Sequence, residues 1–464
     1  MKNNDLLEQL RQGAPLTRRQ QIALTVHLSI PTILAQLSSI IMQYIDASMV
    51  GRLGANDSAS IGLVASVTWL FGGLNSAINS GFIVLVAQHI GARDERTARN
   101  LVKQALAVAI SFSLLLMTIG LLISGRFPYW LGADAELCAN ASRYFFIYAL
   151  GLPIVQFCNL SGGLLQATGN MRTPSVWLIT MCFLDVIFNS LLIFPSLTLG
   201  RITIPGANLG VTGAALGTLL AQATVAGFLL HHLLRRSPAL HLRKGEPFCF
   251  SVPLLQRSIR ISLPVAAQCV VMGGAQVALT SIVAPLKTIA IAANSFAVTA
   301  ESLCYMPGNG IANASSTLIG QSVGAKRREL AYQLGWIGII LGMCVMTVTG
   351  ALMYIAAPWM IGILSPDPAI ISLGAEVLRI EAFAEPFFAA SIVASGVFQG
   401  AGSTKVSTVL NMISMWGIRV PLSALLAPRY GLHGVWIVMA TELTVRGILF
   451  LIHMVRKRWL PADI

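Results

Sequence analysis

Long runs of apolar residues alternate with short polar segments along the whole chain. A membrane-spanning α-helix needs about 20 mainly apolar residues, and each run reaches that length. The runs cover approximately 21–50, 58–88, 101–124, 140–167, 174–197, 210–234, 256–286, 289–320, 331–361, 370–401, 405–427 and 432–455. The pattern therefore predicts twelve transmembrane helices joined by short loops.

Composition agrees with this interpretation. Only 11% of the 464 residues are charged and 55% are apolar, whereas ordinary soluble domains contain about 25% charged residues. Asp5 and Glu8 come before the first apolar run, so we do not expect a secretory signal there. The expected fold class is an all-α integral membrane protein.

Basic residues are distributed unevenly between the predicted loops. The even-numbered loops and both tails hold most of the Lys and Arg residues, and the odd-numbered loops hold only Arg52, Arg126, Arg201, Lys287 and Arg429. Because basic loops stay on the cytoplasmic side, both termini are expected in the cytoplasm, with the protein in the cell (inner) membrane. These loops account for the net charge of +13, so no nucleic-acid partner is expected.

Motifs of the first half recur in the second half at a fixed distance. Three pairs lie 233 positions apart: Ser29-Ile30-Pro31 with Ser262-Leu263-Pro264, Gln88-x-x-Gly91-Ala92-Arg93 with Gln321-x-x-Gly324-Ala325-Lys326, and Leu165-Gln166-x-x-Gly169 with Phe398-Gln399-x-x-Gly402. A fourth pair, Gly210-x-x-Gly213 with Gly431-x-x-Gly434, lies 221 positions apart. An even number of helices per repeat makes the repeats parallel, around a central cavity that carries substrate.

The repeats define the expected domains. We predict an N-terminal six-helix bundle over residues 1–234, a cytoplasmic linker over 235–253 and a C-terminal six-helix bundle over 254–464.

Two residues of the first helix are costly in a lipid environment. Pro31 removes a backbone N–H and allows a bend. Asp46 lies five residues before Gly51, about 8 Å inside the helix end. A carboxylate at this depth is expensive and usually functional, so a bending helix that carries a titratable group is a candidate moving part of an ion-coupled transporter. The alternative for Asp46 is a static aspartate that is hydrogen-bonded or paired with arginine.

Other intramembrane polar groups could act with Asp46. Asp185 and Asn189 are four residues apart and share one face of the fifth helix, at a depth similar to that of Asp46. Glu301 and Glu385 lie in the second half and could hold a cationic substrate or a second ion. The alternatives are a static Asp185 and pairing of the two glutamates with Arg379 or Arg419. Glu442 and Arg446 have the i, i+4 spacing of an ion pair.

Motifs for other chemistries are missing from the sequence. There is no nucleotide-binding loop, no H-E-x-x-H and no G-x-S-x-G. The seven cysteines are scattered without a C-x-x-C pair, which indicates small apolar residues instead of a metal site. No cofactor is expected, the chain is not expected to be an enzyme, and the energy source should be an ion gradient.

Several motifs together carry a family resemblance. They are Pro31 to Asp46 followed by Val50-Gly51-Arg52-Leu53-Gly54, then Gln166-Ala167-Thr168-Gly169-Asn170, Glu301-Ser302-x-x-Tyr305-Met306-Pro307-Gly308, Gln321-Ser322-Val323-Gly324-Ala325-Lys326 and Arg419-Val420-Pro421. They resemble the MATE-family multidrug and toxin extruders over essentially the whole chain. The resemblance implies export of bulky, often cationic or amphipathic compounds, driven by protons or sodium.

The resemblance also implies roles for individual residues. Asp46 carries the coupling ion, and the helix bends at Pro31 as its protonation state changes. Further polar partners fall on the fourth and sixth helices, at Tyr144, Asn159 and Thr218. Gln36, within the first-helix motif, is a further candidate for the cavity.

The sequence departs from the family pattern in two places. The fifth helix often reads Asn-x-x-x-Asp in the family, and here it reads Asp185-x-x-x-Asn189. NorM-like members carry second-half acids at the places of Met272 and Phe388. The second half therefore lacks acids that a sodium site of the NorM-like type would use. The pattern is closer to that of the DinF-like proton antiporters.

The resulting hypothesis is an antiporter that exchanges small organic compounds for H⁺, working as a monomer among membrane lipids. Na⁺ at Asp46, Asp185 and Asn189 is the alternative ion. A second hypothesis is a lipid-linked saccharide flippase of the same superfamily, which would need several cavity-lining arginines. An intramembrane enzyme would need a clustered nucleophile and base, and the sequence offers none.

Overall fold

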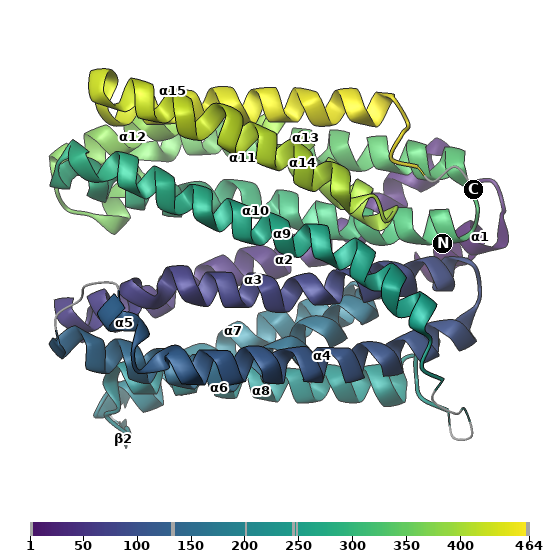
Figure 1. The fold of residues 1–464 in the computed structure, drawn as a ribbon, viewed down its shortest axis with the longest axis horizontal. Helices are drawn as coiled ribbons and strands as arrows, with labels where there is room; N and C mark the ends of the chain where they lie inside the picture. Colours follow the sequence, from purple (N-terminus) through teal and green to yellow (C-terminus); the bar gives the residue numbers. More distant parts are fainter. Residues whose placement is uncertain (1–2, 131–134, 200–201, 244–245, 247–248, 461–464) are drawn as a thin grey trace. The chain divides into compact units, whose positions relative to one another are not determined.

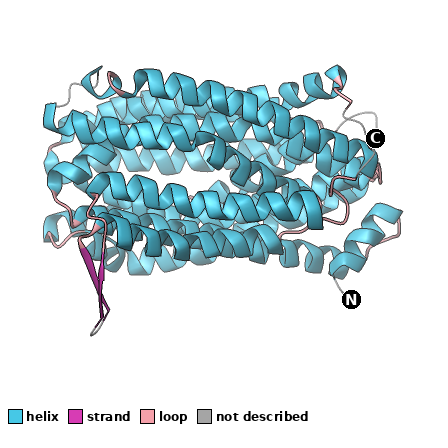
Figure 2. Ribbon diagram, turned by 90° about the horizontal axis from the view of Figure 1, so that it is seen from below, coloured by secondary structure: helices cyan, strands magenta, loops and turns pink. Residues whose placement is uncertain are grey.

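The computed structural model describes residues 3–130, 135–199, 202–243, 246 and 249–460. These residues are helical nearly throughout, and one short hairpin projects from the helix ends (Figure 2). The helices of the first half are α1 Asn3–Gln12, α2 Arg18–Gly51, α3 Ala55–Gly91, α4 Glu95–Ser124, α5 Phe127–Trp130, α6 Ala135–Ala167, α7 Arg172–Ile193 and α8 Gly210–His231, which continues as the π-helix η1 His232–Arg236.

The second half has a similar sequence of elements. It contains α9 Val252–Val283, the 3₁₀ turn η2 Ala284–Leu286, α10 Thr288–Gly324, α11 Arg328–Leu364, α12 Pro368–Ala382, α13 Glu385–Gly400, α14 Thr404–Ser414, the π-helix η3 Met415–Arg419 and α15 Val420–Val455. In the described part of the chain, ten helical stretches are long and apolar enough to cross a membrane. The last stretch, Thr404–Val455, holds two passes because Gly431 (φ 59°) interrupts it. The broken pair α12–α13 adds one more, so the twelve predicted segments are accounted for.

Large apolar side chains cover the outside of the helices. Leu122 is 76% exposed, Ile355 74% and Trp359 70%. A soluble protein would not expose this much apolar surface, and side chains of this kind belong in contact with lipid. The structure therefore agrees with a protein that is solvated by a bilayer.

Two compact units can be distinguished by their internal contacts. The N-half unit consists of Ser38–Val86 and Asp94–Ser262, and the C-half unit consists of Met1–Leu37, Ala87–Arg93 and Leu263–Ile464. In the N-half unit α7 packs against α8, while α6 packs against both α4 and α8 (Figure 1). In the C-half unit α10, α11 and α13 pack against one another, and α15 packs against α13. The predicted domain limits at 234 and 254 remain a prediction.

Glycines of one repeated motif form a reciprocal crossing in the C-half unit. A Cβ atom on Gly91 would lie 2.0 Å from the carbonyl oxygen of Gln321, and one on Gly324 would lie 1.8 Å from that of Gln88. Arg93 and Lys326, two residues after these glycines, both adopt left-handed conformations, with φ of 60° and 58°. Each motif therefore contacts the other at equivalent positions, as expected for parallel repeats related by a twofold axis.

The other repeated motifs also share backbone geometry. Gly169 and Gly402 have φ of 88° and 83°, and Gly210 and Gly431 have φ of 53° and 59°. Glycine adopts positive φ more readily than residues that carry a Cβ atom. The repeats detected in the sequence are thus matched in backbone conformation.

Two elements differ from the sequence prediction. The predicted helix 174–197 is wrong at its end, because α7 stops at Ile193 and Ser196–Leu199 pairs with Ile202–Pro205 as an antiparallel hairpin, β1–β2. Pro195 cannot continue the helix, and the residues after it are rich in β-branched side chains.

The amphipathic helix α1 was not predicted from the sequence. Its Leu6, Leu7 and Leu10 are buried, and Arg11 donates to Gln321 Oε1 at 3.2 Å. Leucines spaced by three and four residues were the available signal, but the helix is too short to stand out as a membrane span.

The glycine crossing gives a first prediction. The methyl group of Gly324→Ala would overlap the backbone carbonyl of Gln88. The substitution should therefore destabilise the protein by about 1–3 kcal/mol. Gly273→Ala is the matched control, since nothing lies within 4 Å of a Cβ atom there and a helical alanine is neutral or favourable. Thermal unfolding in detergent measures both, and equal unfolding temperatures for the two variants would contradict the crossing.

Candidate functional site

A buried polar network links α2 and α7 in the N-half unit. Asn189 Nδ2 donates to Asp46 Oδ1 at 2.9 Å and to Asp185 Oδ2 at 3.0 Å. One amide nitrogen carries two hydrogens, so a single side chain bridges both carboxyls. Asp185 and Asn189 are buried, and Asp46 is partly buried. The structure thus brings together the three residues that the sequence selected as the ion-coupling group.

The end of α7 is held in place by the loop that follows the hairpin. Ala207 N donates to Leu191 O at 2.8 Å and Leu209 N donates to Leu192 O at 2.9 Å. These bonds satisfy carbonyl groups that a helix end would otherwise leave without partners. The last turns of α7, which include Asn189, are therefore fixed in position.

Gly217 on α8 makes room for the bridging amide. A Cβ atom at this position would lie 2.0 Å from Asn189 Oδ1 and 3.0 Å from the Asn189 backbone nitrogen. The glycine lets α7 and α8 approach closely at the network. The sequence analysis did not select Gly217, although Gly213-x-x-x-Gly217 is a small-residue spacing typical of helix contacts in membranes.

The other first-half candidates differ in their distance from the Asp46 network and in their exposure. Tyr144 on α6 is close enough to Asp46 and Asp185 to interact electrostatically with both. Thr218, next to Gly217, is partly buried. Asn159 is exposed on α6, and among the described residues it makes no hydrogen bond to the network. Gln36 is half-buried on α2, in the C-half unit.

The surroundings of Pro31 lie in the C-half unit. Thr32 Oγ1 donates to the carbonyl oxygen of Gly310 on α10 at 2.8 Å. A Cβ atom on Gly310 would lie 2.7 Å from the backbone nitrogen of Ile33. The proline therefore sits beside a close backbone contact between α2 and α10, although α2 remains one helix through it.

Glu301 and Glu385 belong to a second, buried group of acids in the C-half unit. Glu381, which the sequence analysis missed, lies beside them, and the three carboxyls interact electrostatically. The break between α12 and α13 comes just before Glu385 and Pro386, as the proline indicates. Glu381 lies four residues, about one helical turn, before Glu385, and that spacing was the available signal.

Arginines partly compensate these acids. Arg446 pairs with Glu442 at 3.4 Å, which confirms the predicted i, i+4 pair, and Arg419 lies 3.8 Å from the same carboxyl. Arg379 instead donates to the Tyr354 carbonyl oxygen at 3.2 Å. Four buried carboxyls (Glu301, Glu381, Glu385 and Glu442) therefore face two guanidinium groups.

Metal-binding clusters are not found among the described residues, where no group of three or more His, Cys, Asp or Glu side chains could hold a metal ion. The oxygens of Asp46, Asp185 and Asn189 are hard donors, the type that alkali and alkaline-earth cations take.

Comparisons with known proteins agree with the architecture. The MatE family model matches residues 31–191 and 264–425, and the two matched stretches begin at the repeated prolines Pro31 and Pro264. The chain is 25% identical over 439 residues to the "Probable multidrug resistance protein NorM" of Thermotoga maritima, covering 94% of this chain and 92% of that protein.

Solved structures show the same fold. One described as "Crystal structure of MATE in the straight conformation" has a TM-score of 0.87 at 22% identity and covers 97% of both chains. A MOP superfamily transporter from Pyrococcus furiosus, described as having a binding pocket whose reverse polarity suggests a different function, gives the same TM-score and coverage. The two family matches together span more than half of the sequence, and the chain belongs to the MatE family of multi-pass membrane transporters.

Proposed function

We propose that the protein is a secondary active antiporter that exports bulky organic, cationic or amphipathic compounds in exchange for H⁺, with Na⁺ as the alternative ion. The names of relatives such as the multidrug resistance protein of Thermotoga maritima support this substrate class. The observation that carries the coupling mechanism is the Asn189 amide that bridges Asp46 and Asp185.

The bridge joins two carboxyls through a neutral group. No Lys or Arg of the described chain forms an ion pair with either carboxyl. Two adjacent carboxylates repel each other and are costly in lipid, so binding of a proton or a cation relieves the repulsion. The network is therefore suited to taking up one mobile positive charge at a time.

Proton binding can be coupled to movement through α2. Pro31 leaves the carbonyl of His27 without its helical partner, and Thr32 ties the adjacent turn to α10. Asp46 lies farther along the same helix. Protons entering from outside would neutralise Asp46 and Asp185, let α2 bend at Pro31 and expel the substrate, and release towards the cytoplasm would reset the transporter.

The flippase alternative receives less support. It needs arginines free to face lipid phosphates, but Arg419 and Arg446 contact Glu442, and Arg379 is bonded to a backbone carbonyl. Arg143 is exposed. An enzyme is also less consistent with the findings, because the relatives are named as transport or drug-resistance proteins. Glu301 and Glu385 stay candidates for a cationic substrate or a second ion.

Substitution of Asp46 tests the coupling. Asp46→Asn keeps a hydrogen-bonding side chain but removes the titratable group, so dye efflux from proteoliposomes driven by a pH gradient should be abolished. Asp367→Asn is the control, because asparagine also caps α12 through the bond now made to Ala369 N. Unimpaired efflux by Asp46→Asn would contradict the mechanism. If the wild-type protein exports the dye under a sodium gradient but not under a pH gradient, the coupling ion is Na⁺ and not H⁺.

Gly217→Ala tests the bridge without changing either acid. Its methyl group would displace the Asn189 side chain, so transport per folded protein should fall strongly, with an overpacking cost of about 1–3 kcal/mol in stability. Gly227→Ala, on the same helix with nothing within 4 Å of the added atom, should transport normally. The role assigned to the bridge is wrong if both variants transport alike.

Pro31→Ala tests the hinge. Alanine restores an N–H that can bond to the His27 carbonyl, so α2 becomes stiffer and the transport rate should fall while substrate still binds. Pro264→Ala, at the equivalent position of the second repeat, should have a smaller effect on the rate. Measuring efflux rate and substrate binding separately checks this, and equal losses of rate in the two variants would argue against a hinge specific to α2.

A further inference from the structure

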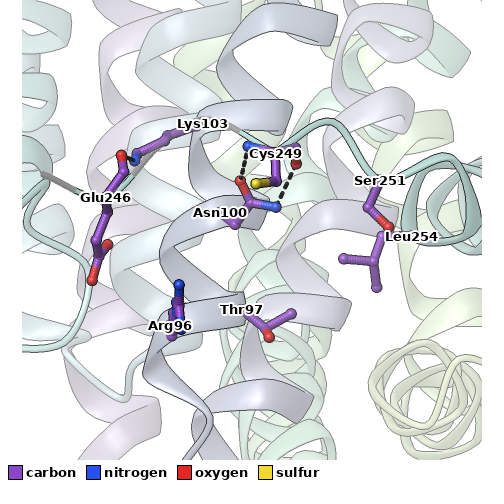
Figure 3. Close-up of a pocket in the computed structure, with 8 residues that line it drawn as sticks. All are labelled: Arg96, Thr97, Asn100, Lys103, Glu246, Cys249, Ser251 and Leu254. Atoms are coloured by element: carbon purple, nitrogen blue, oxygen red, sulfur yellow. Dashed lines mark hydrogen bonds between the residues drawn. The ribbon is translucent and has the colours of Figure 1, made fainter.

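A polar cavity of about 360 Å³ lies in the N-half unit, where the start of α4 meets the segment that leads into α9. Figure 3 shows the eight side chains that line it. They are Arg96, Thr97, Asn100, Lys103, Glu246, Cys249, Ser251 and Leu254. This cavity is separate from the Asp46 network, and the proposed transport mechanism does not use it.

Several hydrogen bonds fix the walls of the cavity. Asn100 Nδ2 donates to Cys249 O at 2.6 Å, and Cys249 N donates back to Asn100 Oδ1 at 3.2 Å (Figure 3). Lys103 Nζ donates to Glu246 O at 2.7 Å. Gln104 Nε2 donates to Ser251 O at 3.0 Å. The segment is therefore attached to α4 over more than one helical turn, and these bonds fix the shape of the cavity.

The one acid of the cavity is already paired. Arg99, which is buried, donates from Nη2 to Glu246 Oε1 at 2.7 Å and from Nε to Oε2 at 3.0 Å. This hydrogen bond lowers the pKa of Glu246, and Lys103 and Arg243 add to the effect by their charges. Glu246 consequently stays ionised and is paired with Arg99, which also contacts the exposed Glu95 at 3.3 Å.

The remaining lining carries excess positive charge. Arg96 is exposed and forms no ion pair with a described residue, and Lys103 bonds only to a neutral carbonyl. Thr97, Asn100 and Ser251 add polar groups around them. Two cations surrounded by hydrogen-bonding groups are suited to an anion with several oxygen atoms, such as a phosphate group.

Exposed apolar residues adjoin a lining residue of the cavity in the sequence. Phe250 is 53% exposed and Val252 is 52% exposed, and they flank Ser251 in the sequence. A free ion would gain nothing from these side chains. An amphiphile could place its phosphate between Arg96 and Lys103 while its acyl chains cover Phe250 and Val252.

We propose that this cavity binds the phosphate headgroup of an anionic phospholipid. The charge bias of the loops predicts that the linker lies on the cytoplasmic side, where anionic lipids attract basic side chains. Arg96 and Lys103 bind the phosphate, and Asn100 holds the wall against which it rests. A bound lipid would attach the linker between the repeats to the membrane surface.

Lipid titration tests the proposal on the full-length protein. Delipidated protein in detergent is titrated with phosphatidylglycerol or phosphatidylcholine, and bound lipid is counted by native mass spectrometry. Each basic residue near a membrane contributes about a fivefold gain in affinity. Arg96→Gln combined with Lys103→Gln should therefore weaken phosphatidylglycerol binding about 25-fold and leave phosphatidylcholine binding unchanged.

Two control variants separate local binding from general effects. Arg172→Gln with Lys405→Gln removes the same charge from exposed residues outside the cavity and should retain binding, as should the charge-preserving pair Arg96→Lys with Lys103→Arg. Loss of binding in either control would contradict the proposal. So would equal binding of the two lipids to the wild-type protein. Displacement of the lipid by millimolar inorganic phosphate would overturn it in favour of a free-phosphate site.

Discussion

The crossing of the two Gln-x-x-Gly-Ala motifs is the contact on which the packing of the C-half unit depends, because its glycines leave less room for a Cβ atom than the other glycines described in that unit. Gly91 lies against the backbone of Gln321, and Gly324 lies against that of Gln88, with no space for a side chain at either glycine. Gln88 Nε2 also donates to Gly400 O at 3.3 Å. The end of α3 is therefore held among helices of the second repeat. The glycine of each motif contacts the glutamine of the other motif, as twofold symmetry requires.

This shared scaffold carries different chemistry in its two copies. Asp46 corresponds to Leu279 and Cys182 corresponds to Met415, each 233 positions later. Leu279 and Met415 pack in one apolar cluster, whereas Cys182 lies beside Asp46 and Asp185. At another pair of positions the acids are in the second repeat. Glu301 and Glu381, which interact with each other, correspond to Thr68 and Tyr148 of the first repeat. There the Tyr148 hydroxyl donates to the Thr68 carbonyl oxygen at 2.7 Å. Residues at equivalent positions are therefore neighbours in both repeats, but acidic residues occupy a given pair of positions in only one of the two repeats.

Features encoded by periodicity and spacing were predictable from the sequence, and features that depend on contacts between helices were not. Apolar runs give the helices, and the i, i+4 spacing puts Asp185 and Asn189 on one face. The space that Gly217 leaves for the Asn189 side chain depends on how closely α8 approaches α7, which no local pattern encodes. Asn159 lies on the exposed face of α6 and outside the Asp46 network, so its place in a substrate cavity stays a prediction.

The two acid groups differ in how their charge can be balanced. In the C-half unit Arg419 and Arg446 are permanent cations that contact Glu442 and interact with Glu301, so part of the negative charge is compensated without any mobile ion. In the N-half unit the amide of Asn189 supplies hydrogen bonds but no charge. A fixed cation would keep the same charge throughout a transport cycle, whereas a neutral bridge leaves the balance to an ion that arrives and departs. The pair Asp46–Asp185 is for this reason better suited to coupling than the larger acid group of the second repeat.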